Sequence, residues 1–314
     1  MAPRKIIIDT DPGQDDAFAI LFALGSPEEL EVVGITTVGG NVPLSLTTKN
    51  ALKVVELAGR PDVPVFAGCP GPMVKPLMTA EYVHGETGLD GAELPEPTTP
   101  VQDEHAVNWM VRTIMDAPEG EITVCTLGPM TNLAMAMTME PRIIPRIREV
   151  VLMGGGFFEG GNATPAAEFN IFVDPHAAHK VFHSGAPVTM APIDCTYTAQ
   201  MTPEWLETLG ATGSRAALEA ANMAGFFCQY GDHKFPTKAR PIHDACVTGY
   251  LLVPQAYEQR ECYVTVDISS SETIGMTVVD WWHVTGKPKN VNVLRRIDPA
   301  PFFDLMLERI SALP

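Results

Sequence analysis

Short β-rich runs alternate with helical patterns through the first two thirds of the chain, and this alternation restricts the possible folds more than any other feature. Residues 5–9 (KIIID) and 31–38 (EVVGITTV) are typical of strands, whereas residues 15–24 (DDAFAILFAL) and 46–59 are typical of helices. Further runs typical of strands begin at residues 63, 121, 148 and 186, and further helical patterns cover residues 104–117 and 130–139. The alternation predicts βαβ units around a mainly parallel sheet flanked by helices, an α/β fold.

Two long irregular regions interrupt this order. Residues 69–103 are rich in proline and glycine, and residues 225–243 mix aromatic side chains, charges and two prolines. Loops of this length inside a compact domain usually serve a function. We therefore predict a single domain over residues 1–314, with mobile active-site loops near 69–103 and 225–243.

The composition narrows the classes of partner and compartment. The formal net charge of −17 argues against a nucleic-acid or anionic-membrane partner, because both need basic surface. The six cysteines are scattered without a Cys-x-x-Cys pair, which favours free thiols in a reducing, cytoplasmic compartment. The apolar run of MAPRKIIIDTD stops after three residues, so it is not typical of a signal peptide, and AFAILFAL is too short to cross a bilayer.

Polar and glycine-rich segments follow the predicted strands at the points where each strand ends. These positions are Asp9 and Asp11, Asn41, Leu127 with Gly128, Met153 with the glycines after it, and Asp194. In an open parallel sheet, ligands bind beyond the carboxyl ends of the strands. We therefore expect these separated segments to converge on one crevice.

The most unusual of these segments is IIIDTDPGQDD, which places four aspartates within eight positions. Two carboxylates about 4 Å apart repel by roughly 4 kcal/mol at an effective dielectric near 20. A helix start favours negative charge but explains one of the four. A bound cation relieves the repulsion, and a set of hard oxygen ligands favours Ca²⁺ or Mg²⁺, with a flexible mixture of ligands favouring Ca²⁺.

Two other motifs share parts of this segment. An EF-hand loop that starts at Asp9 needs glutamate at its twelfth position, where this chain has Ile20. A Mg²⁺-dependent phosphatase of the haloacid dehalogenase type begins with Asp-x-Asp after a strand, which Asp9 and Asp11 match. That scheme has no place for Asp15 and Asp16, and it stays as an alternative.

DTDPGQDDA resembles the N-terminal signature of the nucleoside hydrolase family, of the inosine-uridine-preferring type. Four further blocks follow in the family's order: GITTVGGN, LGPMTNLAMA, VVLMGGG with GNATPAAEFNIFVDPHAA, and PIHDACV. The resemblance covers residues 5 to about 310. It implies the nucleoside hydrolase fold, a single open α/β domain with a mixed sheet and a Rossmann-like core. It also implies hydrolysis of ribonucleosides to ribose and free base.

The resemblance also implies the site residues. Asp11, Asp16, Asp244 and the backbone carbonyl of Leu127 are similar to the family's Ca²⁺ ligands. Its ribose-binding residues correspond to Asp15, Asn41, Asn162, Glu168 and Asn170, with Met153 packed on the sugar. His84, Phe169 and Tyr230 are expected near the base.

Cleavage of the bond to C1′ builds positive charge on the ribose through an oxocarbenium-like transition state. Asp11 is expected to accept a proton from the attacking water, and His243 is the expected acid for the leaving base, because an ordinary histidine pKa lies near neutral pH. His176, His179 and His183 lack a further metal ligand and are expected on the surface or in packing contacts. A non-catalytic protein that binds Ca²⁺ and ribose stays open as a second alternative.

The expected partner is a small nucleoside, without nucleic acid or membrane. The resemblance implies a homodimer or a homotetramer, and base preference stays open between purines and pyrimidines.

Overall fold

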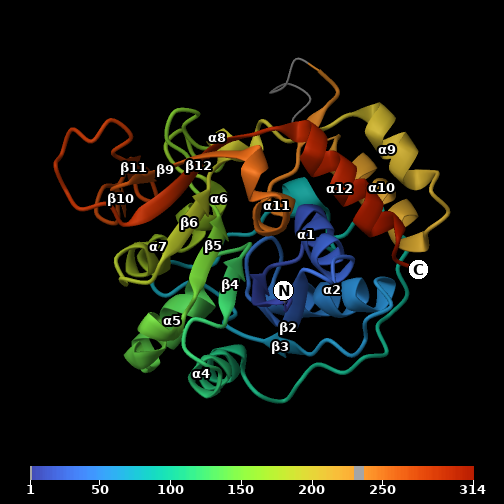
Figure 1. The fold of residues 1–314 in the computed structure, drawn as a ribbon, viewed down its shortest axis with the longest axis horizontal. Coiled ribbons are helices and arrows are strands. Elements are labelled where there is room, and N and C mark those ends of the chain that lie inside the picture. Colours follow the sequence, from blue (N-terminus) through green and yellow to red (C-terminus); the bar gives the residue numbers. More distant parts are fainter. Residues whose placement is uncertain (1, 230–236) are drawn as a thin grey trace.

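The computed structural model describes residues 2–229 and 237–314, and an eight-stranded sheet forms its centre (Figure 1). The strands lie in the order β3 (Val65–Ala67), β2 (Leu30–Thr37), β1 (Arg4–Thr10), β4 (Thr123–Thr126), β5 (Glu149–Met153), β6 (Val188–Ala191), β12 (Val291–Ile297) and β9 (Tyr257–Cys262). All neighbouring strands are parallel except β9, which runs antiparallel to β12. The predicted mainly parallel, mixed sheet is confirmed.

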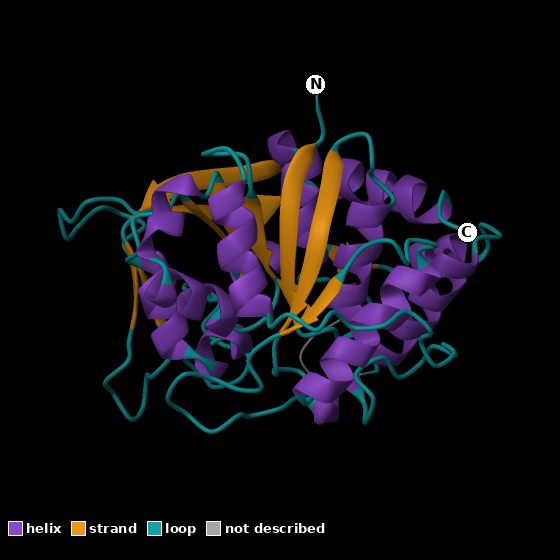
Figure 2. Cartoon of the chain, turned by 90° about the horizontal axis from the view of Figure 1, so that it is seen from below, coloured by secondary structure: helices purple, strands orange, loops and turns teal. Residues whose placement is uncertain are grey.

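Helices cover both faces of the sheet (Figure 2). Alternate side chains of a strand point to opposite faces, so Ile6 and Ile8 pack in one core and Ile7 in the other. The first core contains side chains of α1 (Gln14–Leu24), α2 (Leu44–Leu57), α10 (Arg215–Phe227), α11 (Ala245–Leu252) and α12 (Pro299–Ser311). The second contains those of α4 (Ala106–Asp116), α5 (Thr131–Met139) and α7 (Pro175–Phe182). Because both faces are covered, the middle of β1, Ile6 to Ile8, is entirely apolar.

The order of the strands reverses between β1 and β4. The chain passes from β1 outward through β2 to β3, and then returns to β4 on the other side of β1. Ligands of open α/β sheets bind at such a switch point, beyond the carboxyl ends of the strands. Asp11 follows β1 and Leu127 follows β4, and the Leu127 N–H donates to the Asp9 carbonyl at 2.7 Å. The switch point therefore brings together segments more than a hundred residues apart.

The two irregular regions differ in what they contain. The first includes one short helix, α3 (Glu81–His84). The second was predicted to begin at residue 225, but residues 225–227 belong to α10. Tyr230 lies outside the described residues. The region ends in β8 (Arg240–Pro241), which pairs with β7 (Gln200–Met201).

In the last third of the chain, the sequence predicted fewer of the elements that the structure contains. Residues 262–269 (CYVTVDIS) and 274–282 (IGMTVVDWW) are typical of strands, and the hairpin of β10 (Val264–Val266) and β11 (Thr277–Val279) lies within them. The sequence did not single out α9 (Pro203–Gly210), α10, α11, β9 or β12. Short helices α6 (Phe169–Val173) and α8 (Ile193–Thr196) and the 3-10 turns Pro141–Arg146 and Pro254–Ala256 complete the chain. In the described part, no helix combines the length and apolarity needed to cross a bilayer, and all six cysteines are free thiols.

Candidate active site

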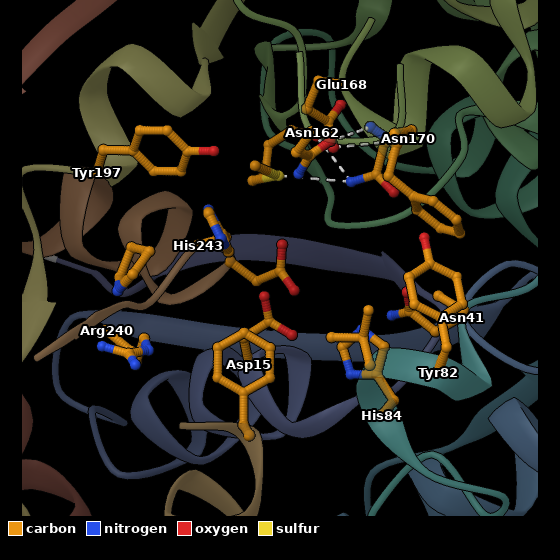
Figure 3. A pocket seen from close by; sticks show the side chains of 18 residues that line it. Asp15, Asn41, Tyr82, His84, Asn162, Glu168, Asn170, Tyr197, Arg240 and His243 are labelled. Carbon is orange, nitrogen blue, oxygen red and sulfur yellow. Dashed lines mark hydrogen bonds between the residues drawn. The ribbon is translucent and has the colours of Figure 1, made fainter. Parts of the chain in front are cut away.

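A cavity opens beyond the carboxyl ends of the strands, next to the switch point (Figure 3). Every residue predicted to bind substrate within the described part of the chain lines it, as do His243 and Asp244. These lining residues are Asp15, Asn41, His84, Met153, Asn162, Glu168, Phe169, Asn170, His243 and Asp244. Asp11, Asp16 and Leu127 lie beneath the lining, almost completely buried. The predicted convergence of separated segments is therefore present in the structure.

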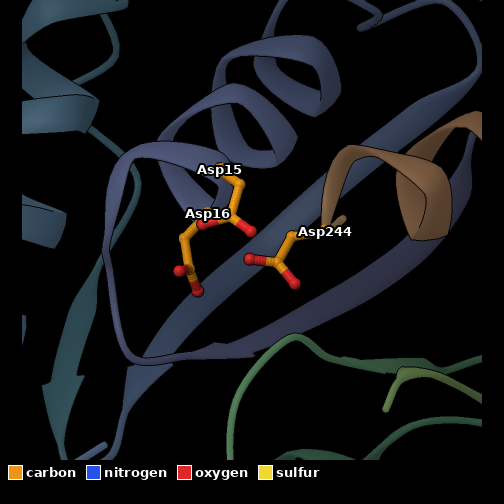
Figure 4. A group of neighbouring side chains, drawn as sticks. All are labelled: Asp15, Asp16 and Asp244. Atoms are coloured by element: carbon orange, nitrogen blue, oxygen red, sulfur yellow. The ribbon is translucent and has the colours of Figure 1, made fainter. Parts of the chain in front are cut away.

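Three buried carboxylates point toward one another at the floor of this cavity (Figure 4). Asp15 and Asp16 come from the first turn of α1, and Asp244 immediately precedes α11. One oxygen atom from each lies within 4.8 Å of the others. Of the predicted metal ligands, Asp16 and Asp244 thus belong to one group, and its third member is Asp15, which was predicted to contact the substrate.

Asp11 lies beside this group, held between two glycines. Its Oδ2 accepts the backbone N–H of Asn41 at 2.7 Å. A Cβ atom at Gly40 or Gly128 would lie 2.0 or 2.1 Å from a carboxylate oxygen of Asp11, so both positions must lack a side chain. The polypeptide thus fixes the direction of the Asp11 carboxylate from two sides.

The donor set fits a hard divalent cation. Oδ1 of Asp11 and Oδ1 of Asp15 are buried and have no hydrogen-bond partner among the described residues. A buried polar atom without a partner is costly, and a bound cation satisfies it. All side-chain donors in the group are carboxylate oxygens, which suit Mg²⁺ or Ca²⁺ rather than zinc or copper.

Burial and mutual repulsion disfavour the charged forms of these acids. Burial raises the pKa of Asp11 well above its ordinary value, and the charge of Asp16 raises it further. Burial and then Asp15 act in the same way on Asp244. Burial, followed by the charge of Asp16, raises the pKa of Asp15 to about 7. Such a group holds its full negative charge only when a positive charge compensates it.

Hydrogen bonds to neighbouring segments orient the acids at the start of α1. Asp16 accepts the Gly13 N–H at 3.0 Å and the Asn41 side-chain N–H at 3.2 Å, and it also bonds to the Thr10 hydroxyl. The Asn41 amide donates to the Asp11 carbonyl as well, at 3.1 Å. Asn41 therefore connects the ends of β1 and α1 with the loop after β2.

Asp9, the first of the four clustered aspartates, has a different environment. Its Oδ1 accepts hydrogen bonds from Thr36 at 2.7 Å and from Asn132 at 2.8 Å, inside the sheet. Burial raises its pKa to about 6. Asp9 thus ties β1 to β2 and α5 below the cavity.

A second wall of the cavity is built around Glu168. Its carboxylate accepts the backbone N–H groups of Gly155 at 2.9 Å and Asn170 at 3.0 Å, and burial raises its pKa to about 7. The Asn170 amide donates to the carbonyls of Leu127 at 2.6 Å and Met153 at 3.2 Å. One lone pair of the Leu127 carbonyl is therefore used by Asn170, and the second can bind another group.

The Gly154–Gly156 turn supports this wall. Gly155 has a φ of +81°, a conformation that side-chain-bearing residues avoid, and its N–H points to Glu168. Asn162 accepts the Phe169 N–H at 2.9 Å, which holds the loop that carries it against α6. Figure 3 shows Asn162, Glu168 and Asn170 together at one side of the cavity.

Two histidines face the cavity from other segments. His243 Nδ1 lies 2.7 Å from the Thr196 hydroxyl oxygen, and the ring centroid lies 5.9 Å from that of Tyr197. His84 is buried and stacks on Phe227 with 5.8 Å between centroids. Burial, followed by the proximity of His243, lowers the pKa of His84 to about 3. His84 is therefore neutral across the physiological pH range.

Several cavity residues were missed by the sequence analysis. They are Ala80, Tyr82, Val83, Ala163, Tyr197, Phe227, Arg240 and Pro241. Tyr82 stands two positions before His84 and Arg240 three before His243, so proximity to a predicted residue was a usable signal for these two. Tyr197 has none, because it follows α8, whose place at the cavity depends on the fold.

Other predicted residues lie elsewhere. Asp194 accepts the backbone N–H groups of Phe157 and Phe158, each at 2.9 Å, and so holds the loop after β5 instead of facing the cavity. His179 and His183 contact Val266 and Thr265 of β10, at 3.2 and 2.9 Å. These contacts to β10 agree with the packing role that the sequence predicted for the two histidines.

Comparisons with known proteins agree on one family. Residues 6–304 match the model of the inosine-uridine preferring nucleoside hydrolase family. The chain is 44% identical over 310 residues to an uncharacterized protein of Schizosaccharomyces pombe, covering 99% of this chain and 100% of that one. It is 42% identical to the pyrimidine-specific ribonucleoside hydrolase RihA of Photobacterium profundum, over 98% and 99% of the two chains. A purine-preferring ribonucleoside hydrolase from Gardnerella vaginalis superposes with a TM-score of 0.91 at 31% identity, over 98% of each chain.

Together with these comparisons, the doubly wound sheet and the buried carboxylate group at its switch point place the chain in a class of hydrolases that cleave nucleosides. This chain belongs to the inosine-uridine preferring nucleoside hydrolase family. It is a nucleoside N-ribohydrolase, an enzyme that acts on ribonucleosides. The phosphatase alternative fails, because the family match spans almost the whole chain and accounts for Asp15 and Asp16.

Proposed function

We propose that this enzyme hydrolyses the N-glycosidic bond of purine or pyrimidine ribonucleosides with the help of Ca²⁺. The observation that carries the proposal is the buried group of Asp15, Asp16 and Asp244, with Asp11 beside it, at the floor of the cavity. Asp11, Asp16, Asp244 and the Leu127 carbonyl would hold the ion. When bound, the ion would make a neighbouring water molecule easier to deprotonate and would attract ribose hydroxyls.

The residues of the chain then perform the proton transfers. Asp11 accepts a proton from the attacking water, because its carboxylate lies beside the group that would hold the ion. The water oxygen forms a bond to C1′ while the N-glycosidic bond breaks. The electron pair of that bond goes to the base, which takes a proton from His243. Attack from the face opposite the base inverts the anomeric carbon.

The remaining cavity residues orient the sugar and the base. Asp15, Asn41, Glu168 and Asn170, together with Asn162, bind ribose hydroxyls, and Met153 packs on the ring. Their support comes from placement, because all of them line the same cavity as His243. Phe169 and His84 contact the base, and Tyr230 is proposed for the same role on sequence alone.

The test is a panel of purine and pyrimidine ribonucleosides scored for released base, with calcium and with chelator. We expect release that depends on the metal and falls to background in Asp11→Ala. Substantial turnover by Asp11→Ala would exclude Asp11 as the base. Tight binding of nucleosides without release of base would instead identify the non-catalytic alternative. Cytoplasmic location and a homodimeric or homotetrameric state stay predictions.

A further inference from the structure

Gln14 is a buried residue of the signature that the proposed mechanism does not use. It is 1% exposed and opens α1, directly before the carboxylates of Asp15 and Asp16. Its side chain points away from those acids toward the segment that carries His84. The absence of a side chain at Gly13 makes room for this contact, because a Cβ there would lie 2.4 Å from His84 Nδ1.

The hydrogen bonds of Gln14 fix the orientation of its amide. One terminal atom lies 2.9 Å from the carbonyl oxygen of His84 and 3.2 Å from that of Asp90. Carbonyl oxygens only accept, so this atom must be the amide nitrogen Nε2. The other terminal atom, Oε1, then faces His84 Nδ1 at 2.6 Å.

This orientation determines the tautomer of His84. The Gln14 Oε1 atom only accepts, so His84 Nδ1 must carry the proton and donate it. A neutral imidazole has one protonated nitrogen, which leaves Nε2 as an acceptor. Among the described residues, the hydrogen bonds of the His84 ring are confined to Nδ1, while the ring lines the cavity.

We propose that Gln14 is a positioning residue that holds His84 in its Nδ1–H tautomer, so that Nε2 offers a hydrogen-bond acceptor to nucleobases with an N–H donor. The inference rests on the proposed function, because it assigns the base-recognition part of the same cavity. It selects the imide or amide N–H of uracil and hypoxanthine and the amino groups of cytosine and adenine over bases that present only acceptors.

The same contact links the two halves of the site. The first turn of α1 supplies Asp15 and Asp16 to the carboxylate group and Gln14 to the base side. Stacking of His84 on Phe227 restrains the ring plane but leaves the tautomer undetermined. Gln14 is the residue that settles it.

The test compares kcat/KM of the unmodified enzyme and of Gln14→Met on three substrates. Methionine keeps the length of the side chain but removes both hydrogen-bonding atoms. Uridine has an N–H donor on its base, pyrimidin-2-one riboside has only acceptors, and 4-nitrophenyl riboside has no nucleobase. We expect kcat/KM for uridine to fall about tenfold, the effect of one buried hydrogen bond. The values for the other two should not fall, because the ribose and carboxylate parts are intact. An equal loss on all three substrates would overturn the proposal.

Asn50 provides a matched control. Its amide donates to the carbonyls of Pro12 at 3.0 Å and Thr87 at 2.8 Å, so it ties the same two segments without touching the His84 ring. Asn50→Ala should affect the three substrates alike. If it gave the selective loss expected of Gln14→Met, the position of the loop would be the cause and the tautomer assignment would be wrong.

A double variant tests whether Gln14 acts through His84. His84→Phe should reproduce the selective loss, and adding Gln14→Met to it should change nothing further. Losses that multiply would show a separate role for Gln14.

The tautomer itself is measurable without substrate. Two-bond ¹H–¹⁵N correlation spectra report which nitrogen carries the proton, and His84→Phe identifies the signal. We expect Nδ1–H in the unmodified enzyme and a mixture in Gln14→Met; Nε2–H in the unmodified enzyme would refute the inference even if the variant does not fold. An enzyme that releases no base from any purine or pyrimidine ribonucleoside would disprove the proposed function, and these spectra would still decide the role of Gln14.

Discussion

Asp244→Asn should change the stability of this protein in opposite directions with and without calcium. The carboxylate oxygens of Asp15, Asp16 and Asp244 lie within 4.8 Å of one another. Each such pair of charges costs at least about 3.5 kcal/mol at an effective dielectric near 20. Asparagine keeps the shape of the side chain and removes one charge, which relieves two of the three repulsions.

Protonation of the acids limits how much stability Asp244→Asn gains in chelator. The pKa of about 7 at Asp15, compared with an ordinary value of 3.8, means that these acids can escape part of the repulsion by taking up a proton. That difference corresponds to about 4 kcal/mol. We therefore expect Asp244→Asn to be about 2–4 kcal/mol more stable than the unmodified protein in chelator at about pH 8.

In excess calcium, the unmodified protein should be the more stable of the two. A ligand that binds only the folded state adds about 4 kcal/mol when its concentration is a thousand times Kd. Asp244→Asn lacks one anionic ligand, so it should receive far less of this stabilisation. The assay is urea denaturation of both proteins followed by tryptophan fluorescence, in chelator and in excess calcium.

Asp194→Asn is the matched control. Asp194 is equally buried, but its carboxylate accepts backbone N–H groups of Phe157, Phe158 and Glu159 and is not part of the acidic group. Its replacement should be destabilising in both conditions. If Asp244→Asn were destabilising in chelator as well, the repulsion that we assign to the acidic group would not exist.

Three further predictions follow from the same geometry. Without metal, stability should fall as the pH rises from about 4 to about 7. In this range the folded state still holds protons on Asp15 and Glu168, whose pKa values are both about 7, whereas the unfolded state has released them. Thermal melts in chelator measure this, and a stability that does not change with pH would contradict the raised pKa values. Gly128→Ala places a Cβ 2.1 Å from Asp11 Oδ1 and should lower kcat about a hundredfold or more, whereas Gly225→Ala, which meets no atom within 4 Å, should leave it unchanged. His243→Gln should lower kcat for uridine by about 10²–10⁴ but spare 4-nitrophenyl riboside, whose leaving group needs no proton; equal losses would remove His243 from the role of acid.

The sequence predicted the parts of the fold that depend on local pattern. The apolar run before Asp9 and the regular alternation of strands and helices up to β6 identified the parallel core, because the buried middle of a strand covered on both faces is mostly apolar. It was less informative for β12 and β9. Residues 291–297 mix polar and apolar side chains, and their place beside β6 depends on pairing with strands distant in the sequence.

The sequence by itself placed four acids at the end of the first strand and predicted a cation among them, and the resemblance to the family added the expectation of a sugar. The resemblance predicted that Asp16 and Asp244 share one site, but only the tertiary structure showed that Asp15 belongs to that group and that Asp9 does not. Asp15 and Asp16 are neighbours in the chain, but Asp244 joins them because α11 packs against α1, while Asp9 lies inside the sheet, bonded to Thr36. The tautomer of His84 is likewise set by Gln14, seventy positions away. Contacts between residues so far apart depend on how the elements pack, and no local pattern encodes them.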